Sequence, residues 1–482
     1  MTRAVRLKDA AVSAWLGGRP GQAESLLAEA REHAGRDSGL DAELTQLRGR
    51  FELNSGNAAE AMRILASGSG LTLPAARSHP ASAESPTDEP PGTPRTTPRT
   101  TLQTTPLTTP LTTALTTALT TARTSVAGPR AAVTGGPGVL GLLADAWEAA
   151  SSVGDSAAIV EIGRHAATFP EGFLRDVLAG VGAMLAGGTG HDLLRRALGR
   201  TGELREAAEF LWAAAAASYL GEADLSAELI GRAGRVARMS GMVGQLPVVL
   251  EFVATAERID GRLAESQAVS EEGLELAREA GYANTVAAHL ANLAALAALR
   301  GEEEPCRRHA QEALAIALPH RVGLRAGVAS YALAMLDLGL GRFAAAHDRF
   351  AGLVTAGPGA GHPTVVWRST PDRIEAAVGA GEAAAAGAAL EAYERWSAHA
   401  GTAESRALLA RCRALAGPEG GDEAVIGALT VALRLHANPF EAARTALLLG
   451  ERLRRAHRPG EARAHLRTAL ETFRLAGAGP WA

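Results

Sequence analysis

The feature that most constrains the fold of this chain is a glycine that recurs every forty residues. Gly221, Gly261, Gly301, Gly341 and Gly381 each open a similar phrase, for example "GEADLSAELIGRA" and "GRFAAAHDRFAGL". Shared composition can produce one such match, but it does not keep the same step through five phrases. The sequence therefore predicts an array of repeating units in which each unit packs on its neighbours.

Two earlier phrases and the end of the chain belong to the same pattern. Gly18 begins "GRPGQAESLLAEA", Gly56 begins "GNAAEAMRILASG", and "RPGEARAHLRTALETFRLAG" begins at Arg458. These stretches are similar although the first and the last are more than four hundred residues apart. We expect both ends of the chain to carry repeats of one array.

Residue size also repeats within the phrase. The fifth residue after the glycine is small in Ala23, Ala61, Ser226, Ser266, Cys306, Ala346 and Ala386. The ninth is often larger and apolar, as in Leu27, Leu65, Ile230, Phe350 and Leu390. The twelfth is often small again, as in Ala30, Gly68, Ala233, Gly273 and Ala313. Small residues let two helices approach closely, and the larger residue fills the space between them.

Each phrase is interpreted as the corner and second helix of a helical hairpin. Ahead of the glycines run segments such as "AAHLANLAALAALR", in which apolar residues recur at three- and four-residue steps, as in a helix. A glycine in the left-handed conformation ends the first helix. The predicted fold is all-α: a TPR-like α-solenoid of antiparallel helix hairpins with a period near forty residues.

One segment interrupts the array. Residues 72–137 contain a repeated Thr-Thr-Pro/Ala-Leu/Arg pattern with proline-rich flanks, which disfavours helix and predicts a disordered insertion. The chain is thus divided into N-terminal hairpins at 1–71, the insertion, and a main array at 138–482. About two hairpins are too few to be stable alone, so we expect the N-terminal segment to dock on the main array or on a partner.

Composition excludes several classes of protein. The 482 residues carry a formal net charge of -4, which gives no argument for binding nucleic acid or an anionic membrane. The two cysteines, Cys306 and Cys412, have no zinc or disulfide spacing, and Cys306 occupies a small-residue position, which predicts a buried thiol. The N-terminus is not a secretory signal, and the apolar run 283–299 is too polar for a membrane span. The predicted location is cytoplasmic.

Catalytic motifs are absent from the sequence. Lys8 is the only lysine, so the chain has no Walker-type phosphate loop. "GPGVLG" at 136–141 follows the insertion and precedes helix, so a linker-to-helix junction is preferred over a dinucleotide fingerprint. His457 and His465 could share a helix face, but no third ligand is evident, and surface histidines are the preferred interpretation. We predict a non-enzymatic protein and assign no catalytic, cofactor-binding or metal-binding residue.

Charged and aromatic residues have ordinary structural interpretations. The carboxylates of "GEEEP" at 302–304 suit a helix N-terminus, and the arginine-rich stretch 451–474 is interspersed with glutamates, as on a solvated helix face. Aromatic residues that could contact a ligand are more typical of hairpin cores: Trp212, Tyr219, Tyr282, Tyr331, Trp367, Tyr393 and Trp396. None is assigned as a site.

Several phrases together resemble a known family. "LRGRFELNSGNAAEA", "LDLGLGRFAAAHDRF" and the closing "NPFEAARTALLLGERLRRAHRPGEARAHLRTALETFRLAGAGPWA" are similar to the helical-repeat region of large ATP-binding LuxR-type (MalT-like) transcription regulators, which are abundant in actinobacteria. The resemblance is strongest from Gly221 to Ala482. It implies an array that senses an inducer or partner protein and relays oligomerisation.

The resemblance does not extend to the ATPase and helix-turn-helix domains of that family, so neither ATP binding nor DNA binding is inferred for this chain. The leading hypothesis is a regulatory module for signal sensing that binds a protein partner or a small inducer. Two alternatives stay open: a fragment of a full ATP-dependent DNA-binding regulator, and a freestanding scaffold for protein–protein interaction. The oligomeric state also stays open, a homo-oligomer included.

Overall fold

The computed structural model describes residues 3–16, 19–34, 38–73, 137–239, 246–355, 361–397, 402–417 and 421–482, which belong to one compact unit. Within these ranges the regular structure is helical, without a strand. The predicted insertion falls almost wholly outside the described residues, as does Gly18. The division into three segments and the disorder of the insertion therefore remain predictions.

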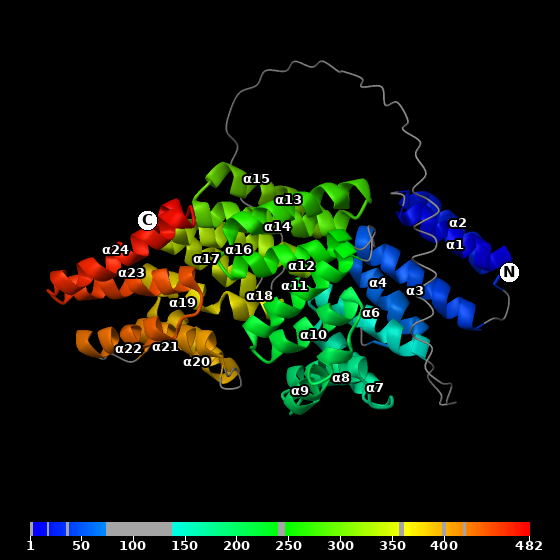
Figure 1. Ribbon diagram of the computed structural model, residues 1–482, viewed down its shortest axis with the longest axis horizontal. Helices are drawn as coiled ribbons and strands as arrows, with labels where there is room; N and C mark the ends of the chain where they lie inside the picture. The colour runs from blue at the N-terminus through cyan, green and yellow to red at the C-terminus, as the bar shows by residue number, and fades with distance from the viewer. Residues whose placement is uncertain are drawn as a thin grey trace, which may run out of the picture. The chain divides into compact units, whose positions relative to one another are not determined.

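The helices before the insertion are α1 (Arg3–Leu16), α2 (Pro20–Glu32), α3 (Ser38–Ser55) and α4 (Ala58–Gly68). Those that follow it are α6 (Pro137–Val153), α7 (Ser156–Ala166), α8 (Phe173–Leu185), α9 (His191–Leu198), the 3-10 turn η1 (Thr201–Glu203), α10 (Ala207–Tyr219), α11 (Ala223–Met239), α12 (Leu246–Ile259), α13 (Leu263–Glu279), α14 (Ala283–Arg300), α15 (Glu303–Ala317), α16 (Gly323–Gly339) and α17 (Phe343–Thr355). The C-terminal elements are α18 (Pro363–Arg368), α19 (Thr370–Ala380), α20 (Ala383–Ser397), α21 (Ala403–Ala416), α22 (Asp422–Leu435), α23 (Pro439–Arg455), α24 (Pro459–Leu475) and η2 (Gly479–Trp481). Consecutive helices pack as hairpins, and the first helix α14 also contacts the first helices α12 and α16 of the neighbouring hairpins (Figure 1).

The five glycines of the forty-residue step end the first helix of each hairpin in the same way. Gly221, Gly261, Gly301, Gly341 and Gly381 have φ values of 75°, 82°, 75°, 71° and 84°, in the left-handed region. The residue after each glycine donates its backbone N–H to the carbonyl five residues earlier, over 2.8–2.9 Å. This is the Schellman hydrogen bond that a left-handed glycine allows.

Gly56 departs from the predicted corner. Its φ lies outside the left-handed region, although it stands between α3 and α4 as expected. Here Asn57 begins the second helix instead, because its side-chain Oδ1 accepts the N–H groups of Ala59 and Glu60. An asparagine N-cap thus replaces the left-handed glycine as the local signal.

The predicted small-residue position is buried in every phrase. Ala23, Ala61, Ser226, Ser266, Cys306, Ala346 and Ala386 all have exposed fractions of 7% or less. Ser226 Oγ donates to the Ala214 carbonyl over 2.9 Å, and Ser266 Oγ donates to the Ala254 carbonyl over 2.7 Å. The serines are therefore accommodated because they hydrogen-bond the backbone of the facing helix.

The other two positions follow the pattern less strictly. Leu27, Leu65, Phe350 and Leu390 are buried at the ninth position. Ile230 is only half-buried because its neighbour Leu229 takes the core position, and Gly68 at the twelfth position is exposed. A helix turns by 100° per residue, so a small rotation exchanges adjacent residues between core and surface.

The N-terminal hairpins contact the repeats after the insertion, as the docking hypothesis requires. Helix α4 packs against α6, and α3 contacts α14. Ser55 Oγ donates to the Gly281 carbonyl over 2.7 Å, and Asn284 Nδ2 donates to the Leu53 carbonyl over 2.6 Å. Trp15 stacks on Phe51 with the ring centroids 4.1 Å apart. The N-terminal helices α1–α4 are thus joined to the repeats after the insertion by packing and by hydrogen bonds near the start of α14.

Candidate ligand-binding surface

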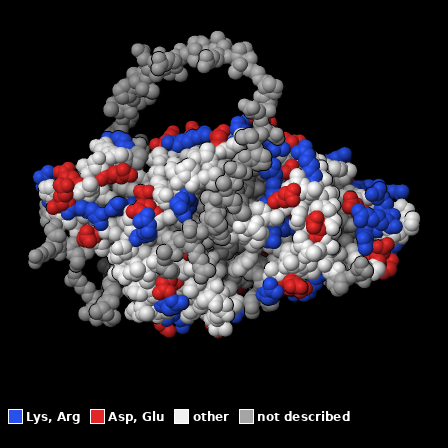
Figure 2. Space-filling model, turned by 180° about the vertical axis from the view of Figure 1, so that it is seen from behind, with Lys and Arg blue, Asp and Glu red and all other residues white. Residues whose placement is uncertain are grey.

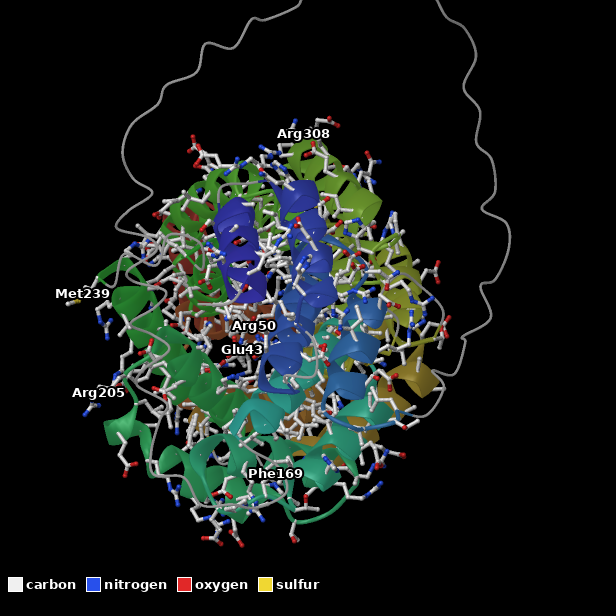
Figure 3. The ribbon with its side chains drawn as sticks, turned by 90° about the vertical axis from the view of Figure 1, so that its right-hand side faces the viewer. Glu43, Arg50, Phe169, Arg205, Met239 and Arg308 are labelled. Carbon is white, nitrogen blue, oxygen red and sulfur yellow. The ribbon has the colours of Figure 1, made fainter. Side chains whose placement is uncertain are left out.

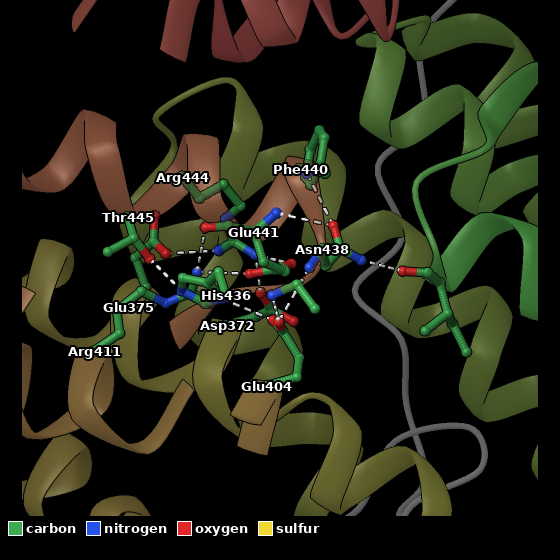
Figure 4. Close-up of polar contacts among 12 residues, drawn as sticks. Asp372, Glu375, Glu404, Arg411, His436, Asn438, Phe440, Glu441, Arg444 and Thr445 are labelled. Atoms are coloured by element: carbon green, nitrogen blue, oxygen red, sulfur yellow. Dashed lines mark hydrogen bonds and ion pairs between the residues drawn. The ribbon is translucent and has the colours of Figure 1, made fainter. Parts of the chain in front are cut away.

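A buried ionic network joins α19, α21 and α23 (Figure 4). Arg444 on α23 donates from one guanidinium nitrogen to Asp372 Oδ1 and from another to Glu375 Oε2, each over 2.6 Å. Arg411 on α21 donates to Glu441 Oε2 over 2.6 Å. Only 2% of Arg444 and none of Arg411 is exposed. The array therefore replaces small apolar residues by paired charges at this point.

The network also fixes the corner between α22 and α23. Glu404 accepts the ring Nδ1–H of His436 over 2.8 Å and the backbone N–H groups of Ala437 and Asn438. The other ring nitrogen of His436 lies 2.8 Å from the Thr445 hydroxyl. These partners of Glu404 and His436 all belong to the fold. In the ionic network, Arg411 Nε and Nη2 and Arg444 Nε are buried without a hydrogen-bond partner among the described residues.

Charge pairing controls protonation in the network. Burial opposes ionisation of Glu441, but Arg411 and Arg444 outweigh it and hold the pKa of Glu441 at about 2. Burial likewise disfavours the cation, yet Glu375, Glu441 and Asp372 raise the pKa of Arg444 above its ordinary value. Both groups stay charged near neutral pH, and their role is structural.

One member of the network leads to a second cluster. The Tyr331 hydroxyl on α16 donates to Asp372 Oδ2 over 2.9 Å. Near Tyr331 lie polar side chains of the first helices of other hairpins, which we call the central polar face: Ser218, Tyr219, Arg258, Asn292, Tyr331 and Arg368. Its helices are α10, α12, α14, α16 and α18.

The arginines of the central polar face bond only neutral groups. Arg258 Nε donates to Asn292 Oδ1 over 2.7 Å, and Arg368 donates to the Ser218 hydroxyl over 3.1 Å. Within the described residues no carboxylate forms an ion pair with either guanidinium. Burial lowers the pKa of both arginines, and repulsion from Arg258 lowers the pKa of Arg368 further. The face therefore holds two neighbouring cations whose hydrogen bonds go to neutral groups, and the carboxylate near Arg258, that of Asp372, is already bonded by Arg444 and Tyr331.

Acidic groups lie on the α6 side of this surface. Arg50 and Gln46 both donate to Asp145, with Arg50 Nε 2.8 Å from Oδ2. Glu148 is exposed and forms no ion pair within the described residues. Although the side chain is exposed, partial desolvation of its carboxylate by the surrounding helices, followed by the negative charge of Asp145, raises the pKa of Glu148 to about 7. Glu148 is thus a carboxylate that gains or loses its proton near neutral pH.

Aromatic rings lie between the acidic and basic parts. Trp147, the neighbour of Glu148 on α6, packs edge-on against Trp212 with centroids 5.0 Å apart and against Tyr219 with centroids 6.4 Å apart. Burial raises the pKa of Tyr219 to about 12, so its hydroxyl keeps its proton. The combination of acids, half-buried rings and unpaired arginines is suited to a ligand with both polar and apolar groups.

The aromatic residues considered from the sequence divide into two groups. Tyr282 and Tyr393 are core residues with exposed fractions of 3% and 4%. The half-buried ones are Trp212, Tyr219, Tyr331 and Trp367. The side chain of Trp396 lies outside the described residues. Arg258 and Arg368 were not found from the sequence, because arginine is abundant throughout it and no spacing marks these two.

The remaining motifs singled out in the sequence occupy structural positions in the fold. Cys306 is fully buried with its Sγ 3.9 Å from the Ala332 carbonyl, and burial raises the pKa of its thiol to about 12. Helix α6 begins at Pro137, so the described part of "GPGVLG" is helical rather than part of a dinucleotide loop. Glu303 and Glu304 occupy the first turn of α15. No group of histidine, cysteine and carboxylate side chains suited to a metal ion occurs among the described residues.

The outer surface has mixed charge. Figure 2 shows arginine and carboxylate side chains interspersed over the visible face. In the basic stretch near the C-terminus, Arg458 pairs with Glu423 and Glu461, and Arg452 pairs with Asp422. Two surface depressions lie on the α23–α24 hairpin, but they are lined mainly by alkyl groups and exposed arginines. The central polar face is the stronger candidate because its charges are crowded and unpaired.

Comparison with known proteins identifies the fold. A Rap protein crystallised with competence and sporulation factor aligns with a TM-score of 0.50 at 11% identity, over 70% of this chain and 98% of that one. Looser similarities, which carry no argument, include aspartyl phosphate phosphatase F from Bacillus subtilis (TM-score 0.40, 12% identity, 72% and 96% covered) and the quorum sensor NprR from B. thuringiensis (0.31, 15%, 70% and 87%). The predicted TPR-like α-solenoid is confirmed.

No family model matches the sequence. No curated protein matches it either. Among the described helices, none combines the length and the apolar character that crossing a membrane requires.

Proposed function

We propose that this chain is a non-enzymatic regulatory module that binds a peptide, or an extended segment of a protein partner, on the central polar face. The observation that carries the proposal is the gathering of Ser218, Arg258, Tyr331 and Arg368 from separate hairpins, with two arginines that form no ion pair among the described residues. Stacked hairpins commonly use the surface of their first helices for recognition. The Rap protein with its bound factor is a second support, because it has the same fold.

The finer proposal is that the array serves as the sensor of a LuxR-type transcription regulator. It rests on the resemblance of the phrases between Gly221 and Ala482 to that family. A small inducer is the alternative ligand, and it would raise the melting temperature of the protein in proportion to its occupancy. Sequencing the transcript on both sides of this reading frame tests the finer proposal, because a regulator requires ATPase and helix-turn-helix coding sequence on the same message.

Binding is tested by selecting peptides from a random display library against the whole chain. Selected peptides are then measured on Tyr219→Ala, within the central polar face, and on Met239→Ala, whose side chain is 87% exposed at the end of α11 (Figure 3). We expect Tyr219→Ala to weaken binding by about tenfold and Met239→Ala to leave it within about twofold, because only the first removes a contact. Equal affinity for both variants would contradict the proposal.

A further inference from the structure

We propose that Arg258 and Arg368 together form a receptor for one carboxylate group of the bound peptide. This inference rests on the proposed function and specifies the chemistry of its partner. Neither residue has a role in the buried network of α19, α21 and α23, where Arg444 and Arg411 already have acidic partners.

The first argument is the number of free donors. A guanidinium has about five N–H groups in a planar fork that matches a carboxylate. Arg258 uses its Nε for Asn292, and Arg368 uses one terminal nitrogen for Ser218. These bonds orient both side chains and leave other donors available. Because the acceptors are neutral, they fix the position of the charge without neutralising it.

The second argument is the contrast with other arginines. Among the described residues, Arg50 pairs with Asp145, Arg325 with Glu251, and Arg349 with Asp337. The carboxylate near Arg258 is that of Asp372, which already accepts from Arg444 and Tyr331. Arg258 is half-buried and Arg368 is exposed, and the positive charge of Arg258 lowers the pKa of Arg368, so an anion bound between them would relieve this repulsion. This part of the surface is therefore completed by an anionic group from outside the chain.

The third argument concerns the kind of anion. On the α6 side, Glu148 is exposed and lies near the buried carboxylates of Asp145 and Glu251, so this side disfavours a long polyanion such as nucleic acid. The rings of Trp147, Trp212 and Tyr219 adjoin the acidic side. A single carboxylate on a peptide satisfies the arginines, leaves the rest of the peptide over the rings, and avoids the acids. Its source is either the peptide C-terminus or an Asp or Glu side chain.

The anion requirement is tested first with glutarate as the probe. The melting temperature of the whole chain is measured with increasing sodium glutarate against sodium chloride of equal ionic strength. The proteins are wild type, Arg258→Gln, Arg368→Gln and, as a control, Arg308→Gln, an exposed arginine on α15 at the outer edge of the view in Figure 3. Circular dichroism checks that each variant is folded.

We expect a saturable rise in wild type and Arg308→Gln, and its loss in both face variants. We also expect Arg368→Gln to melt above wild type without glutarate, because the repulsion from Arg258 is gone. The same rise in all four proteins, or no rise in wild type, would overturn the inference. If one face variant does not fold, Arg258→Lys and Arg368→Lys replace it, and a loss of at least half the rise is expected because lysine lacks the fork.

The source of the carboxylate is then identified with the display-selected peptides. Each peptide is made with a free C-terminus, with a C-terminal amide, and with each acidic residue changed to its amide. One of these changes should weaken binding to wild type by about tenfold and have no effect on the Arg258→Gln/Arg368→Gln double variant. If peptides bind in a Tyr219-dependent way but no such coupling appears, the inference fails while the proposed function stands. If no peptide depends on Tyr219, the proposed function itself fails.

Discussion

Between α10 and α17 the helices approach one another through alanine, serine and glycine, whereas between α19 and α23 they approach through arginine and carboxylate. In the first region the contact positions are fully buried and either apolar or bonded to backbone, as at Ser226 and Ser266. In the second, Arg444 is 2% exposed and paired with Asp372 and Glu375. Helix packing between α10 and α17, the size-dependent region, therefore requires small side chains. Helix packing between α19 and α23, the charge-dependent region, requires paired charges.

The difference shows how to interpret the central polar face. It belongs mainly to the first region, on α10, α12, α14 and α16, and extends to α18. Among the described residues, its two arginines nevertheless lack a carboxylate partner of the kind that Arg444 has in the second region. Arg258 and Arg368 carry positive charge but donate hydrogen bonds to neutral groups, and neither forms an ion pair among the described residues. Local inconsistency of this kind is expected where a protein binds something else. The predictions that follow test whether the two regions respond to substitution as size and charge require.

The largest effect is expected from breaking the charge balance. Arg444→Met leaves Asp372 and Glu375 buried without their cation, and leaves Glu441 with Arg411 alone, which typically costs about 3–5 kcal/mol of unfolding free energy. Urea denaturation measures the change. The control is Arg458→Met, whose partners Glu423 and Glu461 are exposed, and for which a much smaller loss is expected because water screens these ion pairs. Equal losses would show that the network is not the stabilising feature of this region.

The second prediction concerns the pH dependence of stability caused by His289 on α14, in the region between α10 and α17. Burial, together with Arg325, lowers the pKa of His289 to about 4, although its ring N–H to the Pro247 carbonyl opposes this. In the unfolded chain His289 binds a proton below about pH 6.5, whereas in the folded chain it stays neutral down to about pH 4. The free energy of unfolding therefore decreases as pH falls from 6.5 toward 4. The expected loss from this residue is of order 3 kcal/mol.

Urea denaturation between pH 7 and 4.5 tests this on wild type and His289→Asn. The variant should lose less stability over the same interval, whatever its stability at pH 7. Glu148, with its raised pKa of about 7, acts in the opposite sense, because its contribution is lost as pH rises from 4.5 to 7. If the unfolding free energy of both proteins changed equally with pH, the pKa of His289 would not be lowered in the folded state.

The third prediction concerns size alone. A Cβ added to Gly273 would lie 2.1 Å from His289 Cε1, and that ring is fully buried. Gly273→Ala should therefore cost about 1–3 kcal/mol. Gly387→Ala, in α20 with open space around it, should instead stabilise by about 0.5–1 kcal/mol through helix propensity. A similar sign for both would contradict the packing account of the twelfth position.

The smallest effect is expected at the corners. Gly341 has a φ of 71° and nothing near its missing Cβ, so Gly341→Ala tests backbone strain alone and should cost about 1 kcal/mol. Gly301→Ala adds a contact, because its Cβ would lie 2.0 Å from Pro480 Cγ. Thermal melts should place Gly301→Ala below Gly341→Ala. The reverse order would show that Pro480 does not pack closely against the Gly301 corner.

The sequence predicted the size-dependent region because its signals are local. A corner glycine, a small residue five positions later and a first helix before it recur at a fixed step, and among the described residues the departures were the Gly56 corner, the half-buried Ile230 and the exposed Gly68. The charge-dependent region could not be predicted, since Asp372 and Arg444 are 72 residues apart and no spacing links them. The same holds for Arg258 and Arg368, which the fold brings together from α12 and α18.

The most direct test of the account is to locate the bound peptide by photo-crosslinking. Benzoylphenylalanine is placed at Tyr219 in one protein and at Met239 in another, and each is irradiated with a peptide selected from the display library. The account predicts a crosslink from position 219 that excess unlabelled peptide abolishes, and none from position 239. A crosslink from position 239 of equal yield, or none from 219 while the peptide is bound, would contradict it.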